Sequence, residues 1–155
     1  YRLKAGYSRY TIDKAKHYKA FEDMFTGLEQ MNPEVVVLIG DFISPENNEA
    51  DQYEKLRNNF EQIGGIIRQN ELECLRDSTQ WIIMPSTADA GICSIMPGFK
   101  MSEYLIEGFK GKGPQRIKKI MLATNPMRMS FKGKEIVFCR YNYFKKIKKN
   151  HLDKF

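Results

Sequence analysis

The feature that most constrains the fold of this chain is the segment VVVLIGDF, residues 35–42. Five apolar residues run without a break into Gly40 and Asp41. A short apolar run bounded by turn residues predicts a strand buried on both faces, as in the central strand of a sheet covered by helices. The Gly-Asp pair predicts that Asp41 lies at the carboxyl end of that strand, which is the edge where open α/β sheets place their ligand sites.

Amphipathic helices are predicted on both sides of this strand. Residues 13–31 and 51–69 each carry an apolar stripe at spacings of three and four residues. The second stripe contains Gly64-Gly65, which predicts close packing or a break at that point. A further short apolar strand, WIIM, occupies residues 81–84. The order helix, strand, helix, strand is that of an α/β sheet.

The second half of the chain follows a different pattern. The segment KKIMLATNP, residues 118–126, predicts a strand that ends in Thr-Asn-Pro. Residues 127–138 predict a hairpin that turns near Lys132-Gly133. The intervening segment GFKGKGPQR, residues 108–116, predicts an exposed loop. A last helix is predicted from Tyr141 onward.

Size and composition are those of one globular domain, with 155 residues, 42% hydrophobic and 28% charged. The apolar runs are too short for a membrane-spanning helix, and the first residues lack the features of a signal peptide. Because the first residue is Tyr1 rather than Met, we expect a fragment of a longer protein. Three widely spaced cysteines favour reduced thiols over a disulfide framework or a zinc knuckle, as in cytosolic or nuclear proteins.

The net charge is +6, and much of the excess lies in the terminal segment. Four lysines there form a candidate nucleic-acid contact: Lys145, Lys146, Lys148 and Lys149. A basic segment with interleaved aromatic residues can bind a phosphate backbone. The alternative is a solvated helix face that packs Phe144 and Ile147 inward.

A Gly-Asp after a buried strand raises the question of a metal site. Two-metal phosphoesterases hold their ions roughly 3.5–4 Å apart and need several Asp, Asn and His ligands at strand ends. This chain has two histidines, His17 and His151, and neither follows a strand. The strand ends keep three degenerate positions: Asp41, Asp89 and Asn125. We therefore expect no metal site, no cofactor and no catalytic residue.

These departures accompany a resemblance that runs from about residue 33 to about residue 150. The segment NPMRMSFKGKEIVFCRYNYFKKIKKN, residues 125–150, resembles a block of the B-subunits of replicative DNA polymerases, above all those of the epsilon group. The segment WIIMPSTADAG, residues 81–91, resembles that family's strand and Asp-Pro-Gly loop. Two departures are Asp41, where the family commonly has Asn, and Met127, where it has Cys.

The resemblance implies an α/β fold of the calcineurin-like phosphoesterase type, an inactive sandwich with a mixed sheet flanked by helices. Residues 1–155 would be a single partial domain, without the oligonucleotide-binding-type domain and the final strands of the family.

The implied function is that of a nuclear, non-catalytic accessory subunit of the polymerase epsilon complex. It would bind the zinc-bearing C-terminal region of the catalytic subunit, meet DNA as part of that complex and have no contact with a membrane. We expect the loops 44–52 and 86–100 to be its contact regions. Three alternatives stay open: a B-subunit of the sister polymerases alpha or delta, a working metallophosphoesterase, and a stand-alone nucleic-acid-binding module.

Overall fold

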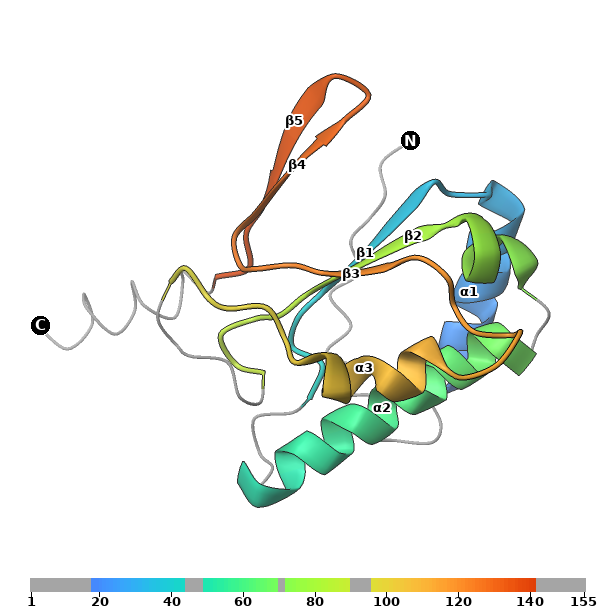
Figure 1. Cartoon of the computed structure of the whole chain (residues 1–155), viewed down its shortest axis with the longest axis horizontal. Helices are drawn as coiled ribbons and strands as arrows, with labels where there is room; N and C mark the ends of the chain where they lie inside the picture. Colours follow the sequence, from blue (N-terminus) through green and yellow to red (C-terminus); the bar gives the residue numbers. More distant parts are fainter. Residues whose placement is uncertain (1–17, 44–48, 70–71, 90–95, 142–155) are drawn as a thin grey trace, which may run out of the picture.

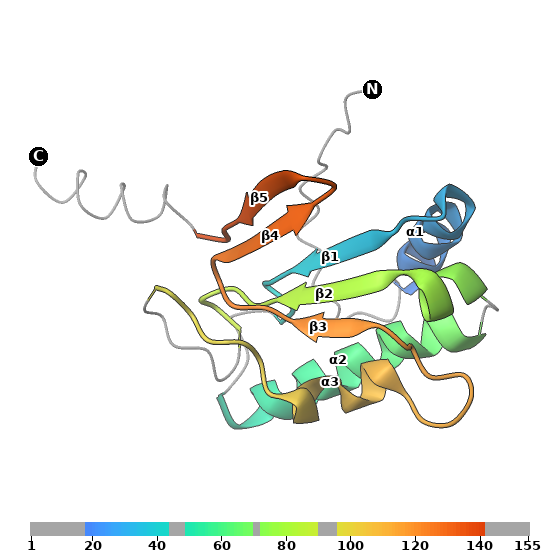
Figure 2. The ribbon, with the colours of Figure 1, turned by 45° about the horizontal axis from the view of Figure 1, so that its top comes forward.

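The computed structural model describes residues 18–43, 49–69, 72–89 and 96–141. A parallel sheet lies between a layer of helices and a β-hairpin (Figures 1 and 2). In chain order the elements are α1 (Tyr18–Met31), β1 (Val35–Ile39), α2 (Glu49–Gln69), a π-helical turn (Cys74–Ser78), β2 (Gln80–Met84), α3 (Glu103–Lys110), β3 (Ile120–Leu122), β4 (Met127–Phe131) and β5 (Lys134–Phe138). The predicted α/β class is confirmed.

The sheet contains three parallel strands in the order β1-β2-β3. All four residues of the predicted WIIM strand are buried, whereas β1 is only partly buried and Ile39 is 41% exposed. Among the described strands β2 is therefore the central one, and the expectation that residues 35–39 are central is corrected. The sequence of β1 is apolar on both faces because each of its faces still meets a covering layer.

Successive side chains of β2 pack alternately against the helices and against the hairpin. Trp81 and Ile83 face the helices, and Ile82 and Met84 face the hairpin. The Trp81 ring packs edge-on against the rings of Phe25 on α1 and Phe109 on α3. The distances between ring centroids are 5.9 Å to Phe25 and 5.4 Å to Phe109. All three aromatic side chains are completely buried. The Trp81 indole N–H donates to the Leu75 carbonyl at 2.6 Å, so the buried ring has no unpaired polar atom.

The predicted hairpin is confirmed, with its turn at Lys132 and Gly133, both of which have a positive φ. Met127 and its neighbours Met129 and Phe138 pack on the sheet face opposite the helices. Within the described residues the parallel and antiparallel strands form two separate sheets, not the single mixed sheet that was expected. The reason is that one face of the hairpin packs against the parallel sheet, and neither hairpin strand pairs with an edge strand of that sheet.

The exposed loop predicted over 108–116 is partly wrong. Gly108, Phe109 and Lys110 belong to α3, a helix that the sequence analysis missed, and Phe109 is completely buried. The loop begins at Gly111, where φ is +71°. The helix predicted from Tyr141 lies outside the described residues except for Tyr141 itself, and so does the start of the one predicted from residue 13. No helix in the described ranges is long and apolar enough to cross a bilayer.

Close packing at the double glycine is confirmed, and α2 continues through it without a break. A Cβ on Gly64 would collide with the backbone of α3, at 2.6 Å from Phe109 Cα and closer still to the Phe109 carbonyl oxygen. A Cβ on Gly65 would meet nothing within 4 Å. Gly64 therefore sets how closely α2 and α3 approach.

This difference between adjacent glycines gives a matched test. Gly64→Ala should lower the free energy of unfolding by about 1–3 kcal/mol, because the two helices must separate. Gly65→Ala should raise it by up to about 1 kcal/mol through helix propensity alone. Urea denaturation of both variants measures the contrast, and equal effects at the two positions would contradict the packing described above.

Candidate functional site

The candidate site lies at the carboxyl ends of the three parallel strands. The structure brings together the three predicted strand-end positions and adds two residues, forming a strand-end cluster of Asp41, Ser86, Asp89, Asn125 and Arg140. Parallel strands end at one edge of a sheet, which is why positions far apart in sequence meet here. The four lysines 145, 146, 148 and 149 lie outside the described residues.

Asp89 holds the ends of β1 and β2 together. The residue is 3% exposed, and its carboxylate accepts three backbone hydrogen bonds. Phe42 N donates to Oδ1 at 2.7 Å, and Asp41 N and Ser86 N donate to Oδ2 at 3.1 and 2.7 Å. The side chain thus closes the turn after β2 and fixes the chain after β1. Both carboxylate oxygens are occupied by donors of the protein itself.

Asp41 is presented by an unusual backbone. Its φ is +64°, in the left-handed region that few residues other than Gly, Asn and Asp adopt. The preceding Gly40 packs so tightly on Ser86 that a Cβ would lie 2.8 Å from Ser86 Cα and still closer to its N and Cβ atoms. The Ser86 hydroxyl accepts hydrogen bonds from Asp41 N at 3.2 Å and Ala88 N at 3.1 Å. The Asp41 carboxylate, turned outward, forms an ion pair with the Arg140 guanidinium.

Asn125 joins the end of β3 to the segment that leaves the hairpin. Its side chain is completely buried. Its Nδ2 donates to the Arg140 carbonyl at 2.9 Å, and its Oδ1 accepts from Arg140 N at 3.0 Å. Its backbone also exchanges two hydrogen bonds with Gly98, at 2.7 and 3.3 Å. The Asn125 side-chain amide thus pairs with the backbone of Arg140 as a neighbouring strand would, and it holds Arg140 opposite Asp41.

The cluster does not fit a two-metal site. The side-chain oxygens of Asp89 and Asn125 accept from backbone N–H groups, and Asp41 faces a guanidinium. No group of three His, Cys, Asp or Glu side chains with the geometry of a metal site occurs in the part of the chain that the structure describes. The sequence between residues 18 and 150 contains no histidine. The arrangement cross-links the strand ends, and all three of these side chains are bonded to other groups of the protein.

Sequence reasoning found the three strand-end positions but missed Ser86 and Arg140. Arg140 is separated from Asp41 by 99 residues, and no local pattern indicates which carboxylate a distant arginine will meet. The short Ser-x-x-Asp spacing from Ser86 to Asp89 did carry a signal, because Asp and Ser side chains commonly bond backbone N–H groups within a turn.

Burial raises the pKa of the Asp89 carboxyl above its ordinary value, because the ionised form loses its hydration. The N–H donors of Ser86, Phe42 and Asp41 oppose this shift by stabilising the carboxylate, but burial is the larger effect. A carboxyl with a raised pKa in the folded state binds its proton more tightly there than in the unfolded chain. Its contribution to stability therefore grows as the pH falls through the folded pKa toward the ordinary Asp value.

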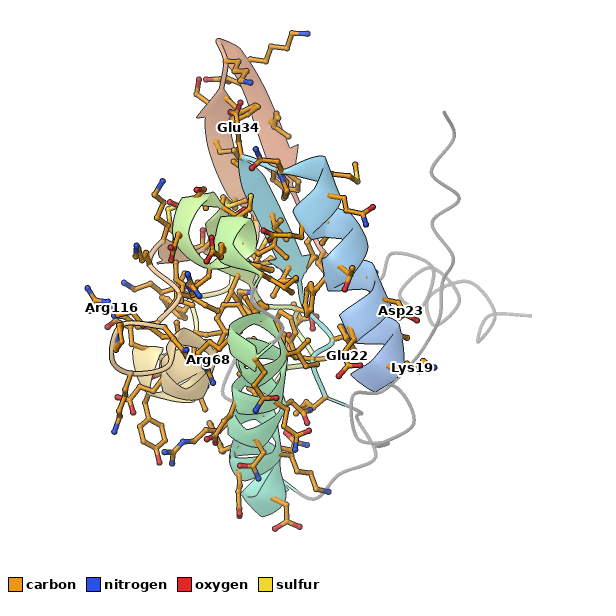
Figure 3. All side chains as sticks on the ribbon, turned by 90° about the vertical axis from the view of Figure 1, so that its right-hand side faces the viewer. Lys19, Glu22, Asp23, Glu34, Arg68 and Arg116 are labelled. Atoms are coloured by element: carbon orange, nitrogen blue, oxygen red, sulfur yellow. The ribbon has the colours of Figure 1, made fainter. Side chains whose placement is uncertain are left out.

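The first prediction at this site concerns Asp89→Asn. The variant should lose about 2 kcal/mol of unfolding free energy or more, because the amide NH₂ would face backbone N–H donors that the carboxylate now accepts. Asp23→Asn is the matched control, since Asp23 lies on the outer surface of α1 (Figure 3) and should show no measurable change. Urea denaturation near neutral pH checks the pair. A harmless Asp89→Asn would contradict the role given to this carboxylate.

The second prediction concerns pH. The difference in unfolding free energy between wild type and Asp89→Asn should grow as the pH is lowered from neutral toward the ordinary Asp value, because the folded carboxyl takes up its proton at a higher pH than the unfolded one and the amide takes up none. Denaturation series across this range measure the difference, and the subtraction removes other groups that titrate in both proteins. A difference that shrinks as the pH falls would show a lowered pKa.

Comparison with known proteins places the chain in a family. Residues 7–154 match the family of DNA polymerase alpha/epsilon B-subunits. The chain is 30% identical over 129 residues to DNA polymerase epsilon subunit 2 of Drosophila melanogaster, across 83% of the chain and 23% of the relative. It is 26% identical over 144 residues to the DNA polymerase epsilon B-subunit of Arabidopsis thaliana, across 91% of the chain and 26% of the relative.

The mouse protein named DNA polymerase epsilon subunit 2 is 25% identical over 139 residues, across 90% of this chain and 25% of its own length. The chain thus spans about a quarter of the length of these curated relatives. Because the family match extends over nearly the whole sequence, the chain belongs to the DNA polymerase alpha/epsilon B-subunit family.

Proposed function

We propose that this chain is part of a non-catalytic accessory subunit of the DNA polymerase epsilon complex, acting in DNA replication in the nucleus. The observation that carries the proposal is the strand-end cluster, whose potential metal ligands are bonded to the protein itself. The names of its relatives, all epsilon subunits, support the choice of polymerase. Residues 1–155 would form part of a calcineurin-like phosphoesterase domain that has lost its chemistry and kept a rigid surface.

The partner in this proposal is the zinc-bearing C-terminal region of the catalytic subunit. A permanent interface of this kind buries more than about 2,000 Å² and has an apolar centre. In the contact region 86–100, Phe99 is 74% exposed. The residue before it, Gly98, is paired with Asn125, so the cluster holds this aromatic residue in a fixed place at the edge of the sheet. Exposed aromatic residues on rigid supports are typical anchors of protein interfaces.

The test is to mix the full-length subunit with that C-terminal region and measure co-elution and affinity. Phe99→Ala should weaken binding about tenfold or more, as the loss of an interface anchor does. Met31→Ala is the matched control, because Met31 is 75% exposed on α1 but lies outside the proposed contact regions.

Separate elution of the two wild-type partners at micromolar concentration would end the subunit proposal. If they co-elute and the two alanine variants bind equally well, the subunit proposal stands and loop 86–100 is not its contact. Charge reversal at Lys145, Lys146, Lys148 and Lys149, the proposed DNA contact of the terminal segment, should leave the protein complex intact and weaken DNA binding.

A further inference from the structure

A second basic segment lies far from the terminal lysines in the sequence. Between Glu107 and Glu135 the chain contains eight basic residues and no acidic one. Five of the eight fall within residues 110–119, from the last residue of α3 to the residue before β3: Lys110, Lys112, Arg116, Lys118 and Lys119. We refer to residues 110–119 as the basic loop.

The basic loop has a fixed base and an exposed rim. Figure 2 shows it at the end of the sheet opposite the carboxyl ends of the strands, where the strand-end cluster lies. Its base is closed by a hydrogen bond from Ile117 N to the Lys110 carbonyl at 2.9 Å, and Ile117 itself is completely buried. Lys118 N donates to the Arg76 carbonyl at 3.0 Å, which ties the loop to the π-helical turn. Residues 112–116 are exposed.

Three cations of the loop have no counter-charge among the described residues. Lys118 pairs with Asp77 at 3.4 Å, and Lys119 donates to the Ser78 carbonyl at 3.1 Å. The side chains of Lys110, Lys112 and Arg116, by contrast, form no hydrogen bond or ion pair with any residue that the structure describes. Figure 3 shows Arg116 projecting from the molecule on the side away from Lys19.

The chemistry of the rim favours a phosphate backbone over a protein partner. Protein interfaces depend on aromatic and apolar anchors, and residues 111–116, GKGPQR, include no large apolar side chain. Phosphate groups need only cations and backbone N–H donors. Gly113, at positive φ and with nothing within 4 Å of an added Cβ, leaves the backbone open to close approach.

We propose that the basic loop is a binding surface for the phosphate backbone of nucleic acid, with Lys110, Lys112 and Arg116 as its contacts. This inference rests on the proposed function, since a component of a polymerase complex works beside DNA. The basic loop would be a second nucleic-acid contact, in addition to the proposed contact at the terminal lysines. We expect binding at the loop to be independent of sequence, because contacts to phosphate groups carry no sequence information.

The test compares two triple variants of the full-length subunit that lose the same charge. One is Lys110→Gln, Lys112→Gln, Arg116→Gln. The control is Lys19→Gln, Arg128→Gln, Lys134→Gln, at exposed positions outside the loop and outside the proposed contact regions. The probe is a mixed-sequence DNA duplex, and its affinity is measured by fluorescence anisotropy between about 50 and 200 mM salt.

Three lost phosphate contacts should make the slope of log K against log salt less negative by about 2.7, so over this salt range wild type loses about 40-fold more affinity than the loop variant. The control triple should keep the wild-type slope. If the loop triple fails to fold, Lys112→Gln with Arg116→Gln should change the slope by about 1.8.

Equal slopes in both triples would overturn the proposal, whether both change or neither does. A poly-glutamate peptide that binds wild type and not the loop variant, with no duplex binding, would overturn it too and assign the loop to an acidic protein. Co-elution with the catalytic subunit separates this inference from the proposed function. A loop variant that co-elutes normally and binds DNA like wild type would remove only the loop surface.

Discussion

The buried carboxylate of Asp89 is the interaction on which the carboxyl edge of this sheet depends. A buried charge is costly unless donors surround it, and Asp89 meets that condition with three backbone N–H groups from two segments. Those segments are thereby held in a backbone path that includes the left-handed Asp41. From α2, Asn59 donates to the Phe42 carbonyl at 3.3 Å, so the helical layer is tied to the same edge.

The two faces of the sheet are stabilised by different means. On the helical face, aromatic rings from α1, β2 and α3 meet edge-on around Trp81, and Gly64 brings α2 and α3 together. On the other face the covering layer is only a two-stranded hairpin, whose Val137 and Ile136 are 58% and 37% exposed. Hydrophobic burial is therefore concentrated on the helical side. Besides the packing of Met127, Met129 and Phe138, the hairpin is attached by the Lys132–Glu34 ion pair at 2.6 Å and the bonds between Arg140 and Asn125.

Much of this arrangement follows from short-range patterns in the sequence. Uninterrupted apolar runs predict β1 and β2, a 3.6-residue stripe predicts α2, and Lys132-Gly133 predicts the hairpin turn, because each signal is local. Helix α3 was missed because eight residues that include Gly108 give too short a period to recognise. The position of β2 between β1 and β3 depends on the path of the crossover connections, and the sequence of a single strand does not indicate that path. The partnership of Arg140 with Asp41 depends on the completed fold.

In the ion pair between Asp41 and Arg140, the cation beside the carboxylate belongs to the protein chain itself. A metal that bridges strand ends must be captured from solution, and its occupancy changes with pH, chelators and competing ions. A guanidinium belongs to the chain, stays charged at any physiological pH and is present once in every molecule that is made. The geometry of the described part of this edge is thus encoded in the sequence itself, through the pairing of Asp41 with Arg140.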